Sequence, residues 1–596
     1  MSRATVKNLE ALRDEMRKVN VSAVIIPGTD PHQSEYICDH WKFRDWVTGF
    51  TGSNGTAVVT LDKAGLWTDS RYFLQADEEL KDSGVDLHKE DIPGEATITE
   101  WLADELKEDD IVGVDGRLFS LNKANQLEIF CGTNGFRFAP DFVPAESIWQ
   151  DRPVRPLDKA FIHKEEYAGE SAQNKIERVL AEVDKLGAEA MLLPALDEVA
   201  WILNLRGTDV MFTPVVISFL YLSEKEKVLF IDSEKLDDEV NEYLKSIDVK
   251  VKPYDEIQTY LNKKVNVNTT VLLDPNQVSD TLGQALEGNK VFAKSPVALL
   301  KAVKNDVQIA GTRKAMERDG AALVRLWMWL ENNVPTGNVN EMTVWEKGKE
   351  FRAQSPLYRE DSFGMIAGYK AHGAIVHYTA SEESASTLEP NGMLLIDSGA
   401  QYLDGTTDIT RTLTLGNPTA QEKHDYTLVL KGHLALGHAN FPVGTRGSQL
   451  DALARIYQWN EYMTYLHGTG HGVGHFLGVH EGPQNIRLNE NSTVLEPGMI
   501  TSNEPGLYKT GQYGIRIENL VLTVPSKKTE KFGDFMKFET LTLFPYDRQL
   551  IDLSMLSDVE IAQINEYHAM VDQRLTPYLN DEEKSWLDKQ TSPITR

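Results

Sequence analysis

The stretch that decides the fold is His467-Gly468-Thr469-Gly470-His471-Gly472-Val473-Gly474-His475-Phe476-Leu477-Gly478-Val479-His480-Glu481-Gly482-Pro483. It places four histidines among closely spaced glycines. A glycine-dense backbone allows a ligand to approach closely, and imidazole binds transition metals and transfers protons. A single histidine would most often be a structural residue, but four in one loop indicate a metal or proton-transfer site.

Two acidic residues lie upstream in a strand context. Asp397 ends the apolar run Met393-Leu394-Leu395-Ile396, and Asp408 begins the β-branched run Ile409-Thr410-Arg411-Thr412. The Asp404-Gly405 turn between the runs predicts a hairpin that brings Asp397 and Asp408 together. Buried carboxylates repel each other unless a cation lies between them. The alternative is a polar hairpin with two surface aspartates, since acidic residues are mostly exposed.

Two further carboxylates lie downstream. Glu504 is expected at the end of a strand, before Pro505-Gly506, and Glu518 is expected inside an apolar strand, where solvent cannot reach it. The complete set is Asp397, Asp408, His471, Glu504 and Glu518. Four carboxylates offset the charge of two divalent cations, as in two-metal hydrolysis. Oxygen ligands favour Mn²⁺, with Co²⁺, Zn²⁺ and Fe²⁺ as alternatives.

The chain of 596 residues is too long to fold around a single hydrophobic core. Residues 1–154 and 155–303 share a pattern of helices and strand pairs, including predicted helices at 4–19 and 166–186, which indicates two similar α/β domains. A long helix is predicted at 307–332. Residues 304–596 form the third domain, which ends in a helical arm. The fold class is therefore α/β and α+β.

Composition excludes several classes of protein. The net charge of −29 argues against nucleic-acid binding, which requires clustered Lys and Arg. No apolar run reaches the roughly 18 residues of a membrane span. The N-terminus predicts an amphipathic helix in place of a signal peptide. The two cysteines, Cys38 and Cys131, are predicted to be free buried thiols, so we expect a cytoplasmic protein without membrane partners.

Six segments resemble those of the aminopeptidase P (Xaa-Pro aminopeptidase) family, in its three-domain form, within the creatinase/prolidase/methionine aminopeptidase type. They are Ile396-Asp397-Ser398-Gly399-Ala400, Thr407-Asp408-Ile409-Thr410-Arg411-Thr412, His467 to Gly474, Val479-His480-Glu481-Gly482-Pro483, Asn503-Glu504-Pro505-Gly506 and Gly514-Ile515-Arg516-Ile517-Glu518-Asn519. The resemblance implies two creatinase-like domains and a pita-bread catalytic domain. In that domain the five residues above would ligate two metals, with Asp408 and Glu518 bridging them.

The same resemblance implies roles for other residues. Glu504 would be the general base for a hydroxide activated by both metals. His377 and His480 would stabilise the carbonyl oxygen, His467 would line the substrate pocket, and Arg71 would reach the substrate from the first domain. The implied reaction is hydrolysis of the N-terminal Xaa-Pro bond in peptides with proline at position two, by a homodimer. Alternatives are a prolidase, which cleaves only Xaa-Pro dipeptides, and a catalytically inactive pita-bread binding module.

Overall fold

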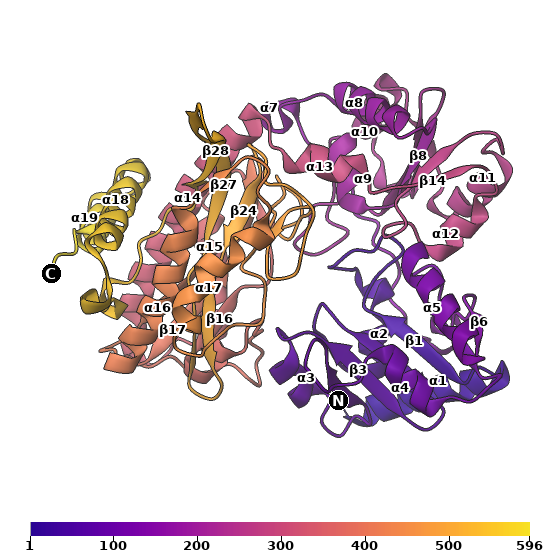
Figure 1. The fold of residues 1–596 in the computed structure, drawn as a ribbon, viewed down its shortest axis with the longest axis horizontal. Helices are drawn as coiled ribbons and strands as arrows, with labels where there is room; N and C mark the ends of the chain where they lie inside the picture. The colour runs from indigo at the N-terminus through magenta and orange to yellow at the C-terminus, as the bar shows by residue number, and fades with distance from the viewer. Residues whose placement is uncertain (1) are drawn as a thin grey trace. The chain divides into compact units, whose positions relative to one another are not determined.

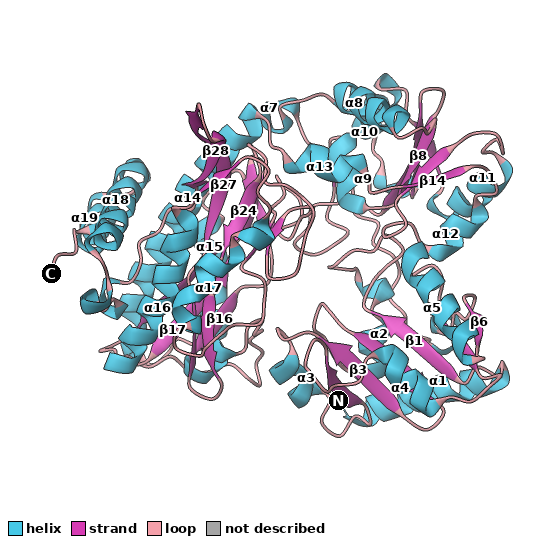
Figure 2. Ribbon diagram, viewed as in Figure 1, coloured by secondary structure: helices cyan, strands magenta, loops and turns pink. Residues whose placement is uncertain are grey.

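The computed structural model describes residues 2–596, which divide into two compact units. The first unit extends to Lys164 and resumes over Glu170–Val297, whereas the second comprises Glu165–Gly169 and Ala298–Arg596. Helices and strands alternate throughout the first unit, while the second combines long helices with strands of up to 11 residues (Figures 1 and 2). No helix among residues 2–596 is long and apolar enough to cross a membrane.

The first unit contains two six-stranded sheets with the same topology. In the first sheet the strands run in the order β4-β3-β2-β1-β5-β6, and in the second they run in the order β12-β11-β10-β8-β13-β14. In each sheet the three strands at positions two to four are antiparallel to one another. One parallel strand extends this group at one edge, and two parallel strands extend it at the other. Because strand order and directions both agree, the predicted pair of similar α/β domains is confirmed.

These sheets are built from short, mostly buried strands. The first uses β1 (Ala23–Pro27), β2 (Thr56–Thr60), β3 (Ala64–Thr68), β4 (Asp86–Lys89), β5 (Ile111–Gly113) and β6 (Arg137–Ala139). The second uses β8 (Ala190–Leu193), β10 (Ser218–Ser223), β11 (Lys227–Ile231), β12 (Lys250–Lys252), β13 (Val271–Leu273) and β14 (Lys290–Phe292). The accompanying helices include α1 (Ser2–Lys18), α2 (Phe43–Thr48), α4 (Ile98–Glu105), α5 (Leu121–Asn134), α9 (Leu196–Ile202), α10 (Asp238–Ser246) and α11 (Ile257–Lys263).

The helix predicted over residues 166–186 is wrong as a continuous element. The structure has α7 (Glu165–Ala168) and α8 (Ala172–Lys185), separated at Gly169, whose φ of 71° is left-handed. A Cβ at Gly169 would also lie 2.4 Å from the Asn305 side chain. Ser171 then caps α8 by accepting a hydrogen bond from the backbone of Asn174. The break coincides with the return of the chain from the second unit to the first.

Two antiparallel sheets of the second unit line its main hydrophobic core, and further sheets of two or three strands accompany them. One sheet has the order β16-β17-β20, and the other has the order β21-β28-β27-β24. Their strands are β16 (Ile366–Tyr369), β17 (Met393–Ser398), β20 (Ile409–Thr414), β21 (Asn440–Pro442), β24 (Ile500–Asn503), β27 (Asn519–Thr529) and β28 (Gly533–Thr540). Leu394, Leu413, Leu520 and Leu522 point from these strands into one hydrophobic core.

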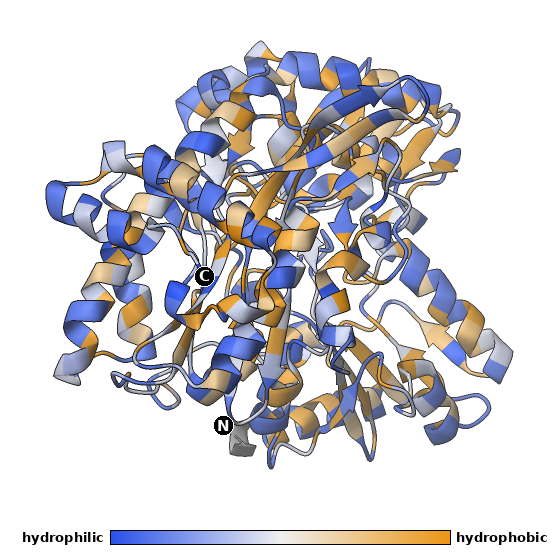
Figure 3. Ribbon diagram, turned by 60° about the vertical axis from the view of Figure 1, so that its left-hand side comes forward, coloured by the Kyte–Doolittle hydropathy of each residue, from blue (hydrophilic) through white to orange (hydrophobic). Residues whose placement is uncertain are grey.

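Helices close this core. They are α14 (Asp306–Asn333), α15 (Glu341–Arg352), α16 (Ala420–Gly437) and α17 (Asp451–Trp459). The long helix predicted at 307–332 therefore exists, and a capping box formed by Asn305 and Gln308 sets its start. Hydrophobic and hydrophilic residues alternate along the helices (Figure 3), as expected where one face packs on a core and the other meets solvent.

The C-terminal arm belongs to the same core. It consists of α18 (Asp558–Leu575) and α19 (Asp581–Thr591). Ile564, Val571, Leu575 and Leu587 of the arm are fully buried in the core that α14 also lines. Most of the arm's apolar side chains are therefore used in packing against its own unit, although Val559 is 66% exposed.

Candidate metal centre

The first two predicted ligands come from neighbouring strands. Asp397 lies on β17 opposite Thr410 of β20, and Asp408 directly precedes β20. Both are buried. Asp397 receives a hydrogen bond of 2.6 Å from Nη2 of Arg516, while its Oδ1 is buried without a hydrogen-bond partner. A buried carboxylate oxygen that nothing in the protein satisfies is a suitable metal ligand.

His471 lies on a short strand, β22 (Gly470–His471), that the glycine-rich loop forms with β23 (Asn485–Ile486). Gly470 is required there because a Cβ would lie 1.9 Å from the backbone oxygen of Ser502. Nδ1 of His471 donates to the carbonyl of Gly472 at 2.9 Å, which leaves Nε2 as the free nitrogen. Nε2 lies 3.5 Å from Oδ2 of Asp408 and 3.4 Å from Oε1 of Glu504.

The two glutamates lie at strand ends. Glu504 directly follows β24, and its Oε1 accepts a hydrogen bond of 3.0 Å from the Ser502 hydroxyl. Glu518 lies in the two-residue gap between β26 (Tyr513–Arg516) and β27, so its predicted place inside a strand is wrong. The two strands join different sheets, because β26 pairs with β25 (Gly506–Lys509), whereas β27 pairs with β24 and β28. The side chain of Glu518 is nevertheless buried, and Thr410 donates to its Oε2 at 2.8 Å.

The structure therefore brings Asp408, His471, Glu504 and Glu518 together, and the charge of Asp397 acts on the same cluster. Ligand atoms of Asp408, His471 and Glu518 all lie within 4.8 Å of one another. Glu504 is within 3.4 Å of the same imidazole. These residues come from widely separated segments of the chain, so their convergence is a property of the tertiary fold.

Electrostatics show that the cluster suits cations. Burial raises the pKa of Glu518 well above its usual range, and the charges of Asp408, Glu504 and Asp397 raise it further. Burial likewise raises the pKa of Asp397 and of Glu504. Burial opposes a charged His471, but the hydrogen bond that its ring donates to Asp408 and the charge of Glu504 outweigh this effect and raise the pKa of His471 to about 9. Divalent cations would remove the repulsion that these shifts reflect.

The predicted substrate-binding histidines lie around the cluster. The ring of His480 stands at 80° to that of His471, with the ring centres 4.4 Å apart. Nε2 of His467 is 2.8 Å from the Tyr508 hydroxyl. His377 is half-buried and follows Val376, whose carbonyl accepts a hydrogen bond from Arg516. Arg71 belongs to the first unit, where Asp69 binds its guanidinium at 2.7 Å, and its role with substrate stays a prediction.

Sequence reasoning missed two residues of this site. Nη1 of Arg516 donates to the Tyr508 hydroxyl at 2.8 Å, so that Asp397, Arg516, Tyr508 and His467 form one hydrogen-bonded chain. Arg516 was recognisable, because it stands two positions before Glu518 in a segment predicted as a strand and would share its face. Tyr508 carries no comparable signal in its local sequence.

Two further histidines of the second unit, His372 and His475, have partners outside the cluster. His372 bonds the buried Glu341 carboxylate at 2.9 Å and stacks on Tyr378. His475 is buried and lies 3.3 Å from the Thr312 hydroxyl and 3.2 Å from the carbonyl of Tyr167. Neither contact involves a predicted ligand.

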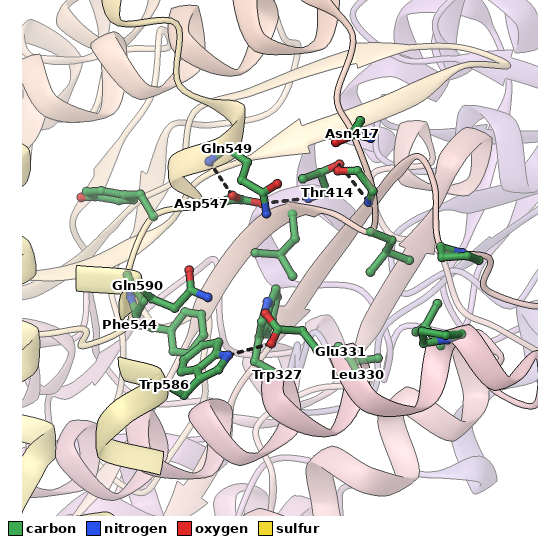
Figure 4. Close-up of a pocket in the computed structure, with 18 residues that line it drawn as sticks. Trp327, Leu330, Glu331, Thr414, Asn417, Phe544, Asp547, Gln549, Trp586 and Gln590 are labelled. Carbon is green, nitrogen blue, oxygen red and sulfur yellow. Dashed lines mark hydrogen bonds between the residues drawn. The ribbon is translucent and has the colours of Figure 1, made fainter. Parts of the chain in front are cut away.

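A separate pocket lies on another part of the second unit. Its cavity volume is about 360 Å³, and its lining includes Trp327, Glu331, Phe544, Asp547 and Trp586. Trp586 donates to the Glu331 carboxylate at 2.8 Å (Figure 4). None of the residues predicted for catalysis lines this pocket.

Comparison with protein families covers the chain from end to end. Residues 8–148 and 151–308 each match the creatinase/prolidase N-terminal domain. Residues 310–525 match metallopeptidase family M24, and residues 534–594 match the C-terminal region of that peptidase. The fold and the acidic cluster thus define a metallopeptidase of the M24 class with creatinase-type N-terminal domains.

Individual relatives show which family of M24 metallopeptidases the chain is similar to. Aminopeptidase P2 of Arabidopsis thaliana is 39% identical over 97% of this chain and 87% of its own length. Xaa-Pro aminopeptidase 1 of Dictyostelium discoideum is 38% identical over 99% of this chain and 97% of its own. The chain belongs to the aminopeptidase P family of M24 metallopeptidases.

One solved structure resembles this protein over nearly the whole length of the chain. The X-prolyl aminopeptidase of Caenorhabditis elegans, described as a cytosolic enzyme with a di-nuclear active site, superposes with a TM-score of 0.96. It is 33% identical and covers 99% of this chain and all of its own. The Xaa-Pro dipeptidase of Bacillus anthracis, with 23% identity and a TM-score of 0.52, covers 63% of this chain and shares the fold.

Proposed function

We propose that this protein is a metal-dependent aminopeptidase that hydrolyses the N-terminal Xaa-Pro bond of peptides. The observation that carries the proposal is the convergence of Asp408, Glu504 and Glu518 on the imidazole of His471 inside the second unit, with the charge of Asp397 acting on the same cluster. Asp397, Asp408, His471, Glu504 and Glu518 would hold two divalent cations. When bound, these cations would polarise the scissile carbonyl and lower the pKa of water. Their oxygen-rich surroundings favour Mn²⁺ over Co²⁺, Zn²⁺ or Fe²⁺.

The protein's own side chains account for the proton transfers. Glu504, oriented by Ser502 and close to His471, takes a proton from the attacking water and delivers it to the leaving proline nitrogen. His480 and His377 donate hydrogen bonds to the carbonyl oxygen as negative charge develops on it. His467 lines the pocket, held through Tyr508 and Arg516.

Proline on the C-terminal side of the scissile bond requires a dedicated pocket. An Xaa-Pro bond is a tertiary amide without an N–H, so a peptidase that relies on that donor cannot bind it. The tripeptide Xaa-Pro-Yaa separates this proposal from its alternatives. We expect the purified protein to release Xaa from it, to lose activity with a chelator and to regain activity fastest with Mn²⁺. Hydrolysis of the dipeptide alone would indicate a prolidase, and inactivity with every ion would indicate a binding module.

The proposal extends to domain limits and location. The matched creatinase-type regions support domains at 1–154, 155–303 and 304–596. A cytoplasmic location is supported by the described location of the Caenorhabditis elegans enzyme and by Cys38 and Cys131, which are free and buried. Burial raises the pKa of both thiols to about 11, so neither is reactive.

We also propose that the protein forms a homodimer, and that the exposed face around α17 supplies contact surface. Leu453, Ile456, Trp459, Tyr462 and Leu466 form a run of exposed apolar side chains there. Tyr462 is 99% exposed and Leu466 is 63% exposed, which is costly for a surface that stays in water. This face is a better candidate than the C-terminal arm, whose apolar residues are mostly buried in their own unit.

A further inference from the structure

Glu518 is held from two sides by consecutive residues of β20. Thr410 and Arg411 point to opposite faces of the sheet, as neighbours on a strand do. On one face, the Thr410 hydroxyl donates to Oε2 of Glu518 at 2.8 Å. On the other, Nη1 of Arg411 donates to the backbone oxygen of Glu518 at 2.6 Å. The side chain and the backbone of this glutamate are therefore positioned by the same strand.

The bond from Arg411 matters because Glu518 lies outside regular sheet pairing. It occupies the gap between β26 and β27, where the sheet ladders do not hold the backbone. Its N–H donates to the carbonyl of Thr410 at 3.1 Å, and its own carbonyl accepts from Arg411. Buried backbone carbonyls need a partner. Arg411 thus sets the direction in which the Glu518 backbone, and with it the side chain, enters the site.

The position of the Arg411 side chain is set in turn by hydrogen bonds to neutral groups that are not themselves predicted metal ligands. Its guanidinium is buried, and it donates to the carbonyls of Pro545 and Phe544, to Oδ1 of Asn519 and to the Tyr567 hydroxyl. All these acceptors are neutral, so directional hydrogen bonds hold the planar group in place.

Tyr567 brings the C-terminal arm into this network. It lies on α18, and its hydroxyl accepts from Nη2 of Arg411 at 2.9 Å. The same hydroxyl lies 3.0 Å from the carbonyls of Thr542 and of Phe544, to either of which it donates. The ring is nearly buried, and its centre is 4.8 Å from that of Tyr546. Because Ile564, Val571 and Leu575 anchor α18 in the core, the hydroxyl is delivered to a defined place.

We infer that Tyr567 is a positioning residue for Glu518 and acts through Arg411. The inference rests on the proposed function, in which Glu518 is a metal ligand. It gives the C-terminal helices a role in shaping the metal centre, although they contribute no ligand. Outer partners of metal ligands generally change metal affinity by about 10- to 100-fold when they are removed.

The test is the Mn²⁺ affinity of chelator-stripped, full-length protein, measured by titration calorimetry. Tyr567→Phe removes only the hydroxyl, and we expect about 10-fold weaker binding, at the lower end of that range because the effect passes through Arg411. Tyr578→Phe is the matched control. Tyr578 follows α18 in the same arm, and its hydroxyl donates to Glu317 at 2.7 Å. This control is expected to bind Mn²⁺ as wild type does, although it too loses a hydrogen bond of the arm.

Arg411→Lys provides a second variant if Tyr567→Phe does not fold. It keeps the charge but has one nitrogen in place of three, so it is expected to weaken Mn²⁺ binding at least as much. In the double variant the two losses are expected to be less than additive, because both act on one chain of contacts. A merely structural role would instead lower the unfolding temperature of Tyr567→Phe and leave the Mn²⁺ affinity of the folded protein unchanged.

Glu518→Gln separates failure of this inference from failure of the proposed function. If Glu518→Gln loses Mn²⁺ while Tyr567→Phe and Arg411→Lys bind it as tightly as Tyr578→Phe does, the inference is overturned and the metal centre stands. If Glu518→Gln binds Mn²⁺ as wild type does, Glu518 is not a ligand, and both the ligand assignment and the inference fail.

Discussion

Replacing Asp408 with asparagine is expected to stabilise the metal-free protein and to abolish its response to metal. Asp408 is buried and interacts unfavourably with three carboxylates, those of Asp397, Glu504 and Glu518. Against these repulsions, Asp408 makes an ion pair with His471 at 3.5 Å. The asparagine has nearly the same shape and removes all four interactions, so the balance of three repulsions against one attraction decides the sign.

The expected change in the free energy of unfolding follows from the distances between the charged side chains. Two unit charges about 4 Å apart interact by about 4 kcal/mol at an effective dielectric constant of about 20. Proton uptake by the raised carboxyl groups relieves much of this repulsion. We therefore expect metal-free Asp408→Asn to be more stable than metal-free wild type by about 1–3 kcal/mol, a fraction of one such pair. In a unit of this size, each kcal/mol raises the unfolding temperature by about 2 °C.

Scanning calorimetry with and without Mn²⁺ measures both parts of the prediction. Wild type is expected to gain about 2.7 kcal/mol at free Mn²⁺ one hundred times its Kd. Asp408→Asn is expected to gain almost nothing and to be inactive. A metal-free variant that is less stable than wild type would show that the carboxylates do not repel one another as the structure implies. A variant with normal Mn²⁺ binding and activity would remove Asp408 from the ligand set.

Three other predictions concern substrate, pH and assembly. His377→Ala is expected to lower kcat/KM by an amount equivalent to about 2.7–4 kcal/mol at normal metal content, since one transition-state hydrogen bond is lost; metal analysis showing depletion would make His377 a ligand instead. Burial lowers the pKa of His433 and of His568 to about 3, so the unfolded chain takes up protons below about pH 6.5 while the folded protein does not. Each histidine therefore contributes stability that is fully present above about pH 6.5 and is lost toward pH 3, by about 1.4 kcal/mol per pH unit. The buried carboxyl groups of the metal centre, whose pKa values are raised, act in the opposite direction, so the check compares wild type with His568→Gln. The change in the denaturant midpoint from pH 7 to pH 5 is expected to be less destabilising in the variant, and an equal change in both proteins would contradict the prediction. Light scattering at micromolar protein is expected to give the mass of a dimer for wild type and of a monomer for Ile456→Asp. A monomeric wild type would refute the proposed homodimer, whereas a dimeric Ile456→Asp would refute only the proposal that the α17 face forms the contact.

Much of the site could be predicted from the sequence because its signals are local. Acidic residues at strand ends, a histidine among glycines and an Asp-Gly turn each reflect short-range rules of backbone geometry and burial. The paired α/β domains were predictable for the same reason, since strand and helix periodicity is read over a few residues. The prediction of one continuous helix at 166–186 was wrong because it gave the helical pattern of the segment more weight than Gly169, where the structure breaks the helix.

The tertiary structure alone decided how these parts meet. Glu518 was expected inside a strand, but it lies between two strands that join different sheets, a choice made by long-range pairing. The chain of contacts from Asp397 through Arg516 and Tyr508 joins residues with no common sequence pattern. Tyr567 approaches the site only because α18 packs on the core formed by earlier segments. Hydrogen bonds between residues distant along the chain depend on the complete packing of the unit, and no local pattern of residue types encodes them.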